Sequence, residues 1–154
     1  MILHLLMSFL ALLPQAHAAS PHEPLQMRNT FAHPEDVVRY YCGRDASGFV
    51  WSGLLDIERQ AFTLWKQAPQ KDSFYIAKTY EIKAKQVKSD SAEVEVTYDL
   101  IGIGDAFGTR YPPYRNPYQV VFQLKRVSGS WKIEKPEPSE IAPVVVETQF
   151  PYGS

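Results

Sequence analysis

The sequence predicts an α+β fold in which helices precede a β-sheet. Two segments in the first half have apolar residues spaced by three or four, the period of an amphipathic helix. From residue 74 the apolar period changes to two, as in a strand with one buried face. The strongest local signal is a hairpin over 118–134, because two β-branched and aromatic runs flank the short turn at residues 128–130. We expect the rest of the chain to cover that hairpin.

The first 18 of the 154 residues have the features of a secretory signal peptide. The apolar run from Ile2 to Leu13 carries no charge and is too short to span a bilayer. The small-residue pattern at residues 16–18 fits a signal peptidase, so we expect cleavage after Ala18. This predicts a secreted or periplasmic protein whose mature chain has no membrane span. The alternative is a buried N-terminal helix.

Residues 19–32 contain Pro21 and Pro24 and show no hydrophobic periodicity, so we expect an extended lead-in. The remaining residues, 33–154, have a length that suits one domain.

A first helix is predicted over about residues 34–45. Pro34 suits the first helical position, and two acidic residues follow it in the first turn, where the helix dipole favours them. Residues four apart form one apolar stripe: Val37, Val38, Tyr41 and Cys42. Cys42 is the only cysteine and cannot form an internal disulfide. We expect it to be buried and inert, the alternative being a reactive or intermolecular thiol.

A second helix is predicted over about residues 54–66 and ends before Pro69. Its apolar residues are spaced by three or four: Leu54, Ile57, Ala61, Leu64 and Trp65. The three tryptophans, Trp51, Trp65 and Trp131, each belong to an apolar pattern, so we interpret them as core residues rather than ligand-stacking ones.

The strands follow in order. Residues 74–85 alternate, with Ile76, Tyr80, Ile82 and Ala84 expected on one face and a bulge near Gln86. After a polar turn, residues 93–100 alternate most regularly, with Val94, Val96, Tyr98 and Leu100 on the buried face. In the hairpin, Tyr118, Val120, Phe122 and Leu124 share the face of Trp131 and Ile133. The run 144–146 is expected to add an edge strand.

The segment between the two strand regions is rich in glycine, tyrosine and proline. Residues 102–108 superficially resemble a phosphate loop, but they lead into Tyr111-Pro112-Pro113 rather than into a helix, so we expect a flexible turn. The stretch 105–118 is more aromatic and cationic than a connection requires. We predict that it is the functional surface, through Phe107, Arg110, Tyr111, Tyr114, Arg115 and Tyr118. Tyr80 and Tyr98 on the strands are further candidate binding residues. The alternative is a loop whose rings fill the open end of the core.

Several function classes find no support in the sequence. The near balance of 16 basic and 17 acidic residues argues against binding to nucleic acid or to an anionic membrane. The mature chain would keep only two histidines and shows no ligand spacing for a metal. It has no G-x-S-x-G motif for nucleophilic catalysis. We therefore expect no metal, no cofactor and no assigned catalytic residue.

The local patterns resemble those of the NTF2-like superfamily, also called cystatin-like or SnoaL-like. The resemblance lies in Pro34–Tyr41, which opens the first helix, Asp45–Gly48, which closes it, and the strands Ser91–Tyr98 and Gly129–Ile133. It covers about residues 33–138 and is closest to secreted bacterial members. It implies N-terminal helices packed on a strongly curved antiparallel sheet, a cone. It also implies pairing through the outer sheet face, for which the moderately polar face here predicts a monomer or a weak homodimer.

Members of that superfamily range from isomerases and epoxide hydrolases to binding modules, so the resemblance does not choose a function. The inward strand positions here are apolar or aromatic, which favours a non-catalytic module that binds a small apolar ligand or a protein partner. An isomerase or hydrolase is the first alternative. It would need an acid from Asp56, Glu58 or Asp105 at the mouth of the cone, with Tyr80 or Tyr98 as donor. An immunity-type or structural partner protein with a filled pocket is the second.

Overall fold

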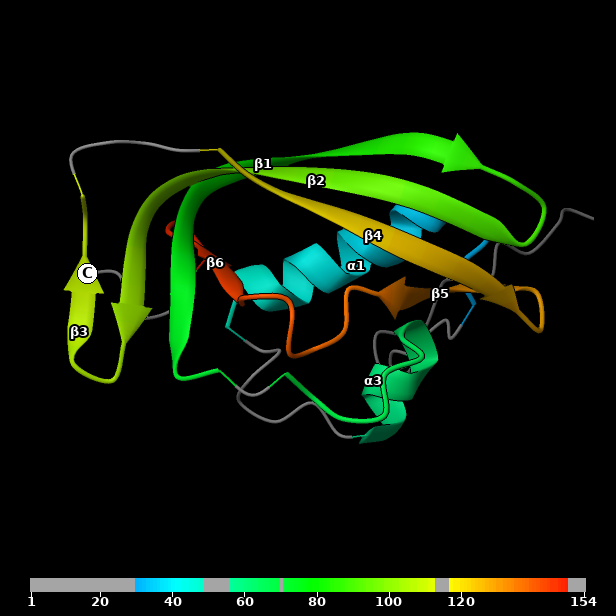
Figure 1. The fold of residues 1–154 in the computed structure, drawn as a ribbon, viewed down its shortest axis with the longest axis horizontal. Helices are drawn as coiled ribbons and strands as arrows, with labels where there is room; N and C mark the ends of the chain where they lie inside the picture. The colour runs from blue at the N-terminus through cyan, green and yellow to red at the C-terminus, as the bar shows by residue number, and fades with distance from the viewer. Residues whose placement is uncertain (1–29, 49–55, 70, 113–116, 150–154) are drawn as a thin grey trace, which may run out of the picture.

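The computed structural model describes residues 30–48, 56–69, 71–112 and 117–149. In these residues the chain forms an α+β structure in which a strongly curled sheet makes a half-barrel around one helix (Figure 1). The expected signal peptide and nearly all of the lead-in lie outside the described residues. Among the described residues, no helix is both long and apolar enough to cross a membrane.

Helix α1, Pro34–Ala46, confirms the first predicted helix. It begins with Pro34 at its first turn, has Glu35 and Asp36 beside it, and carries Arg44 in its last turn. The predicted stripe is fully buried: Val37, Val38, Tyr41 and Cys42. Figure 1 shows α1 lying in the hollow of the sheet, so this stripe forms one side of the main core.

Helix α3, Asp56–Phe62, is shorter than the predicted second helix. The chain leaves the helix at Thr63, which forms a β-bridge with Ile133, and the Leu64 N–H donates to the Ile133 carbonyl over 2.8 Å. The apolar residues spaced by three or four therefore belong partly to α3 and partly to the non-helical segment after it. Ile57, which the spacing placed on the buried face, is 78% exposed. Trp65 is buried, as expected of a core residue. Leu54 and Trp51 lie outside the described residues.

The sheet has the order β5-β4-β2-β1-β6, with β3 paired to the far end of β2. Its strands are β1 Ser73–Val87, β2 Ser91–Asp105, β3 Gly108–Arg110, β4 Pro117–Val127, β5 Ser130–Lys135 and β6 Val144–Val146. The hairpin β4–β5 and the edge strand at 144–146 are confirmed. The sheet is not purely antiparallel, however, because β6 runs parallel to β1.

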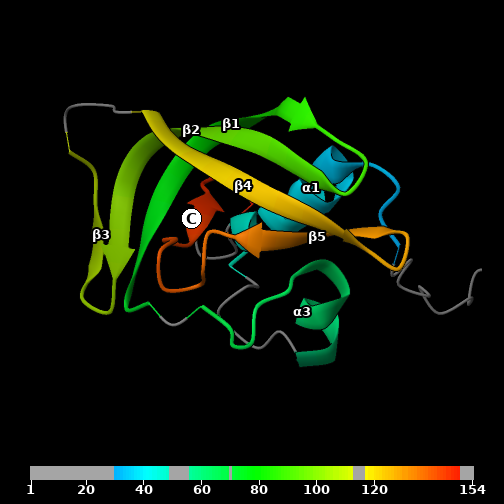
Figure 2. The ribbon, with the colours of Figure 1, turned by 45° about the vertical axis from the view of Figure 1, so that its right-hand side comes forward.

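Breaks in register accompany the curvature of the sheet. One irregularity between Ala84 and Gln86 confirms the predicted bulge, and another separates Ala77 from Tyr80. Bulges increase the local twist of a strand, and Figure 2 shows β1 and β2 bending strongly in the half that carries β3 and β6. The bulge between Ala77 and Tyr80 also shifts the alternation. Tyr75 and Ala77 therefore pack in the main core with Tyr80, whereas Ile76, which we expected on that face, does not.

Ile76 belongs to a second, smaller cluster with Phe74 and Val145, against which Ile101 packs. Gly104 is essential to this cluster, because a Cβ placed there would meet the Phe74 ring at 2.1 Å. Gly102 to Asp105 are thus the end of strand β2, and the prediction of a flexible turn over 102–108 is wrong for them. Their glycines make room for neighbouring rings.

Candidate binding site

The candidate site begins at a gap along one edge of β2. Strand β4 pairs with β2 as far as Asp99, and β3 pairs with it only from Ile103, so among the described residues 100–102 have no strand partner on that side. A cavity of about 280 Å³ lies at this gap. Its lining is mostly apolar and includes Leu100, Ile101, Ile103, Pro112, Pro117 and the side chains of Tyr75 and Tyr118. The broken pairing of β2 therefore creates the cavity.

Four tyrosines, Tyr75, Tyr80, Tyr98 and Tyr118, form a continuous group that we call the tyrosine cluster. The rings of Tyr75 and Tyr118 have centroids 5.0 Å apart at the cavity. Tyr118 stacks on Tyr98 at 6.0 Å, and Tyr98 lies 5.7 Å from Tyr80. Strand register explains the arrangement, because Tyr98 faces Tyr80 on β1 and Tyr118 on β4. The cluster thus runs from the cavity into the core.

The inner end of the tyrosine cluster contacts helix α1. The Tyr98 hydroxyl lies 3.3 Å from Cys42 Sγ, and both side chains are almost completely buried. Burial raises the pKa of the Cys42 thiol to about 12 and the pKa of the Tyr98 hydroxyl well above its usual range. Both groups therefore stay neutral near pH 7. The expected burial of Cys42 is confirmed, and its neutral thiol is a poor nucleophile.

Asp45 is a buried carboxyl group one turn beyond Tyr41 on α1. Its Oδ2 accepts a hydrogen bond from the Val144 N–H over 2.9 Å, which ties the end of α1 to β6. Burial raises its pKa to about 8, although the Val144 N–H and the Tyr41 hydroxyl both act to lower it. Its Oδ1 and the Tyr41 hydroxyl have no partner at hydrogen-bond geometry among the described residues. The carboxyl is thus mostly protonated at neutral pH.

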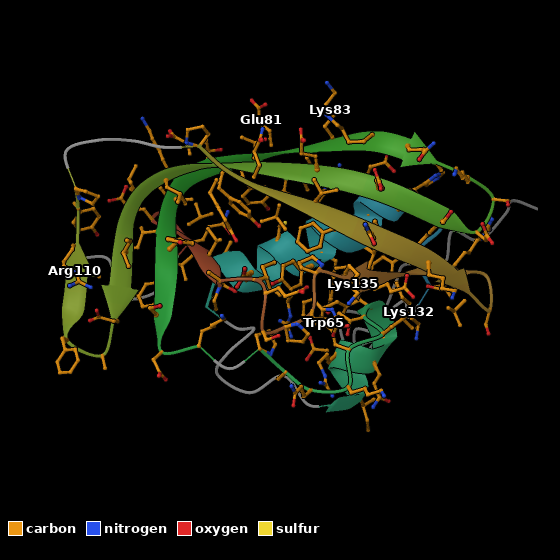
Figure 3. All side chains as sticks on the ribbon, viewed as in Figure 1. Trp65, Glu81, Lys83, Arg110, Lys132 and Lys135 are labelled. Carbon is orange, nitrogen blue, oxygen red and sulfur yellow. The ribbon has the colours of Figure 1, made fainter. Side chains whose placement is uncertain are left out.

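The residues predicted to bind separate into two groups. Tyr80, Tyr98 and Tyr118 come together in the tyrosine cluster, but Tyr98 is only 1% exposed and serves as its inner support. Phe107 is fully exposed at the turn between β2 and β3. Arg110 extends from β3 (Figure 3) and donates from Nη2 to Asp105 Oδ2 over 2.7 Å.

Tyr111 connects the two groups. It is 57% exposed, and its ring covers Gly102, where a Cβ would lie 2.9 Å from the ring. Two further predicted residues, Tyr114 and Arg115, lie outside the described residues. In the described part of the segment 105–118, Pro112, Pro117 and Tyr118 line the cavity, whereas Phe107 lies in the turn between β2 and β3.

Sequence reasoning missed Tyr75, Leu100 as a cavity residue, and Asp45. Tyr75 was not among the predicted residues, because the bulge after Ala77 changes the strand phase and alternation alone does not locate a bulge. Asp45 had a usable signal. It continues the buried stripe of α1 four residues after Tyr41, so a carboxyl group in the core could have been expected.

Two of the acids considered for catalysis, Glu58 and Asp105, do not line the cavity. Glu58 Oε1 accepts a hydrogen bond from the Tyr40 hydroxyl over 3.1 Å and pairs with Arg44, and Asp105 pairs with Arg110. The side chain of Asp56 lies outside the described residues. Asp45 faces inward but is not among the residues that line the cavity. Within the described ranges, no group of three or more histidine, cysteine or acidic side chains could hold a metal ion.

The fold and site together define an α+β half-barrel with a small apolar cavity bordered by tyrosines. No family model matches the chain, and neither the curated proteins nor the solved structures compared with it give a significant match.

Proposed function

We propose that the chain is a secreted or periplasmic binding module of the NTF2-like type, without catalytic activity, that holds a small apolar ligand in the cavity at the β2 gap. The observation that carries the proposal is the lining of that cavity. Apolar side chains surround it, and the rings of Tyr75 and Tyr118 offer broad contact area with little loss of side-chain entropy. Cavities with this kind of lining are typical of small-molecule sites.

The size of the cavity limits the ligand. At about 280 Å³ it is slightly smaller than typical small-molecule sites, which span about 300 to 1,000 Å³. A compound with one or two rings suits this volume, and flat rings suit the tyrosine faces. A long acyl chain does not. The proposal therefore concerns compact ring compounds with few polar groups.

Ligand binding can be tested with indole, naphthalene and cyclohexanol as probes. We expect at least one ring compound to raise the melting temperature in a concentration-dependent manner, because a ligand of the folded state stabilises it by mass action. Leu100→Trp should fill the cavity and abolish the shift. Thr97→Val, on the opposite face of the same strand, is the matched control and should keep it. An equal response of both variants would contradict the proposal.

The isomerase or hydrolase alternative depends on Asp45, the inward carboxyl with a raised pKa. It requires that carboxyl to reach a bound substrate, whereas the carboxyl bonds Val144 and does not line the cavity. The partner-protein alternative requires a filled pocket, which the open cavity disfavours. Native mass spectrometry of protein purified from its own compartment distinguishes the binding module from the partner protein, because a retained small molecule supports the binding module.

The proposed periplasmic or secreted location rests on residues 1–18 alone. N-terminal sequencing of exported material should begin at Ala19, since the small residues at positions 16 and 18 place the cleavage there. A mature chain that keeps residues 6–13 would contradict an exported protein.

A further inference from the structure

One edge of strand β1 is open over much of its length. Strand β6 pairs with β1 only at Tyr75, Ile76 and Ala77, and the Glu147 N–H then donates to the Ala77 carbonyl over 3.0 Å. Beyond that point, no strand in the described part of the chain pairs with this edge from residue 80 to residue 87. A long open edge presents rows of backbone donors and acceptors that another strand can join.

The side chains along this edge alternate strictly. Tyr80, Ile82 and Ala84 are half-buried on the side of α1, while Glu81 and Lys83 are exposed on the other side. Figure 3 shows Glu81 and Lys83 pointing away from the sheet, opposite α1.

The charges on the outer side of the edge differ in their partners. Lys85 has a partner within the chain, since its Nζ lies 3.4 Å from Glu95 Oε2. Glu81 and Lys83 form no ion pair with any other described residue. As far as the described residues extend, these two opposite charges on one edge are thus available to an outside partner.

We propose that two copies of the chain join antiparallel along this edge, with Ile82 facing Ile82 of the second copy. In this register Glu81 faces Lys83 of the second copy, and the two-fold symmetry forms that pair twice. Tyr80 then faces Ala84 of the second copy, so a large side chain meets a small one. The two sheets become one continuous sheet across the symmetry axis.

The charges select this register over its neighbours. A shift by one residue would place inner side chains opposite outer ones, which strand pleating forbids. A shift by two residues in one direction places Lys83 opposite Lys83, and in the other direction Glu81 opposite Glu81. Like charges directly opposite each other are unfavourable. Among these registers, only the one centred on Ile82 pairs both charges.

The inner side of the edge also has room for a second copy. A hollow of about 390 Å³ lies there, lined by Arg39, Thr79, Tyr80, Ile82 and Gln149, and it leaves Tyr80 and Ile82 partly open. Ile82 and Ala84 of the second copy would cover these side chains. The contact is independent of the ligand cavity, which lies at the β2 gap. It differs from the pairing through the outer sheet face that the sequence resemblance implies.

Sedimentation velocity tests the proposal by charge exchange. The wild type should self-associate with a dissociation constant between about 1 and 100 μM, as expected of a small interface. Glu81→Lys alone, or Lys83→Glu alone, should weaken association at least about tenfold, because each places like charges together twice. An equal mixture of the two variants restores opposite charges at both positions and should recover association. The double variant, with the charges exchanged, should recover it by itself.

A matched control makes the same change of charge away from the edge. Glu93→Lys lies on the outer side of the central strand β2 and should leave association unchanged, and circular dichroism should show that every variant is folded. Wild-type protein that stays monomeric at about 100 μM would overturn the proposal. So would single variants that associate as well as the wild type, or a mixture that fails to recover while both variants are folded.

Discussion

The two ends of strand β2 behave differently. From Ala92 to Tyr98 it pairs with β1 on one side and with β4 on the other, its side chains alternate between core and outer face, and Val94 and Val96 are completely buried. At residues 100–102 it has no strand partner on the β4 side among the described residues, two glycines lie in this half of the strand, and the cavity opens there. Regular pairing produces a solid core, whereas interrupted pairing leaves space that a ligand can use. The regular end of the strand thus supports the core, and the proposed ligand site lies at its other end.

The largest expected effect is at the regular end. Trp131→Ala removes a ring that is 3% exposed and packs in the main core, so we expect a loss of about 3 to 5 kcal/mol in the free energy of unfolding. Chemical denaturation measures this loss. A loss below about 1 kcal/mol would mean that the ring is not part of the core.

The next effect belongs to the interrupted end. Gly104→Ala should destabilise the chain by about 1 to 3 kcal/mol, because the new Cβ would overlap the Phe74 ring. Gly43→Ala on α1 is the matched control. A Cβ there meets nothing within 4 Å, and alanine favours a helix, so we expect a gain of about 1 kcal/mol. A Gly104→Ala variant as stable as the control would show that Phe74 moves freely.

Asp45 should make stability depend on pH. The unfolded chain releases this proton near pH 4, whereas burial holds the folded-state pKa near 8, so the free energy of unfolding should fall as pH rises from about 4 to about 8. Asp45→Asn keeps an acceptor for the Val144 N–H but cannot ionise. At pH 9 the variant should be more stable than the wild type by about 1 to 3 kcal/mol.

Thermal unfolding of the Asp45→Asn variant and the wild type across this pH range measures the difference. The difference should vanish near pH 4, where both forms are neutral. A difference that stays constant from pH 4 to pH 9 would mean that Asp45 does not titrate in this window.

The smallest effect is expected at the tip of the β2–β3 turn. Phe107 is fully exposed, so Phe107→Ser should change the free energy of unfolding by no more than about 0.5 kcal/mol. It should also leave the melting-temperature shift by ring compounds intact, because Phe107 does not line the cavity. Loss of that shift would extend the binding site to the turn.

The comparison also shows what the sequence can predict. Helix α1, the β4–β5 hairpin and the regular half of β2 were predictable, because local periodicity reports burial directly wherever pairing is regular. The cavity was not, since it depends on where β4 stops pairing and on a bulge that turns Tyr75 inward. Tyr98 and Tyr118, two of the candidate site residues, come together in the tyrosine cluster, whereas Arg110 pairs with Asp105.

The hydrogen bond between Asp45 and Val144 joins residues that are 99 positions apart in the chain. A second contact of the same span joins the Phe31 N–H to Ser130 Oγ. During synthesis the helix and the first strands therefore emerge long before the residues that complete them. A nascent chain that ends before residue 144 would leave the Asp45 carboxyl without this partner and the β1 edge without β6. The domain reaches its final form only when its last strand has been made.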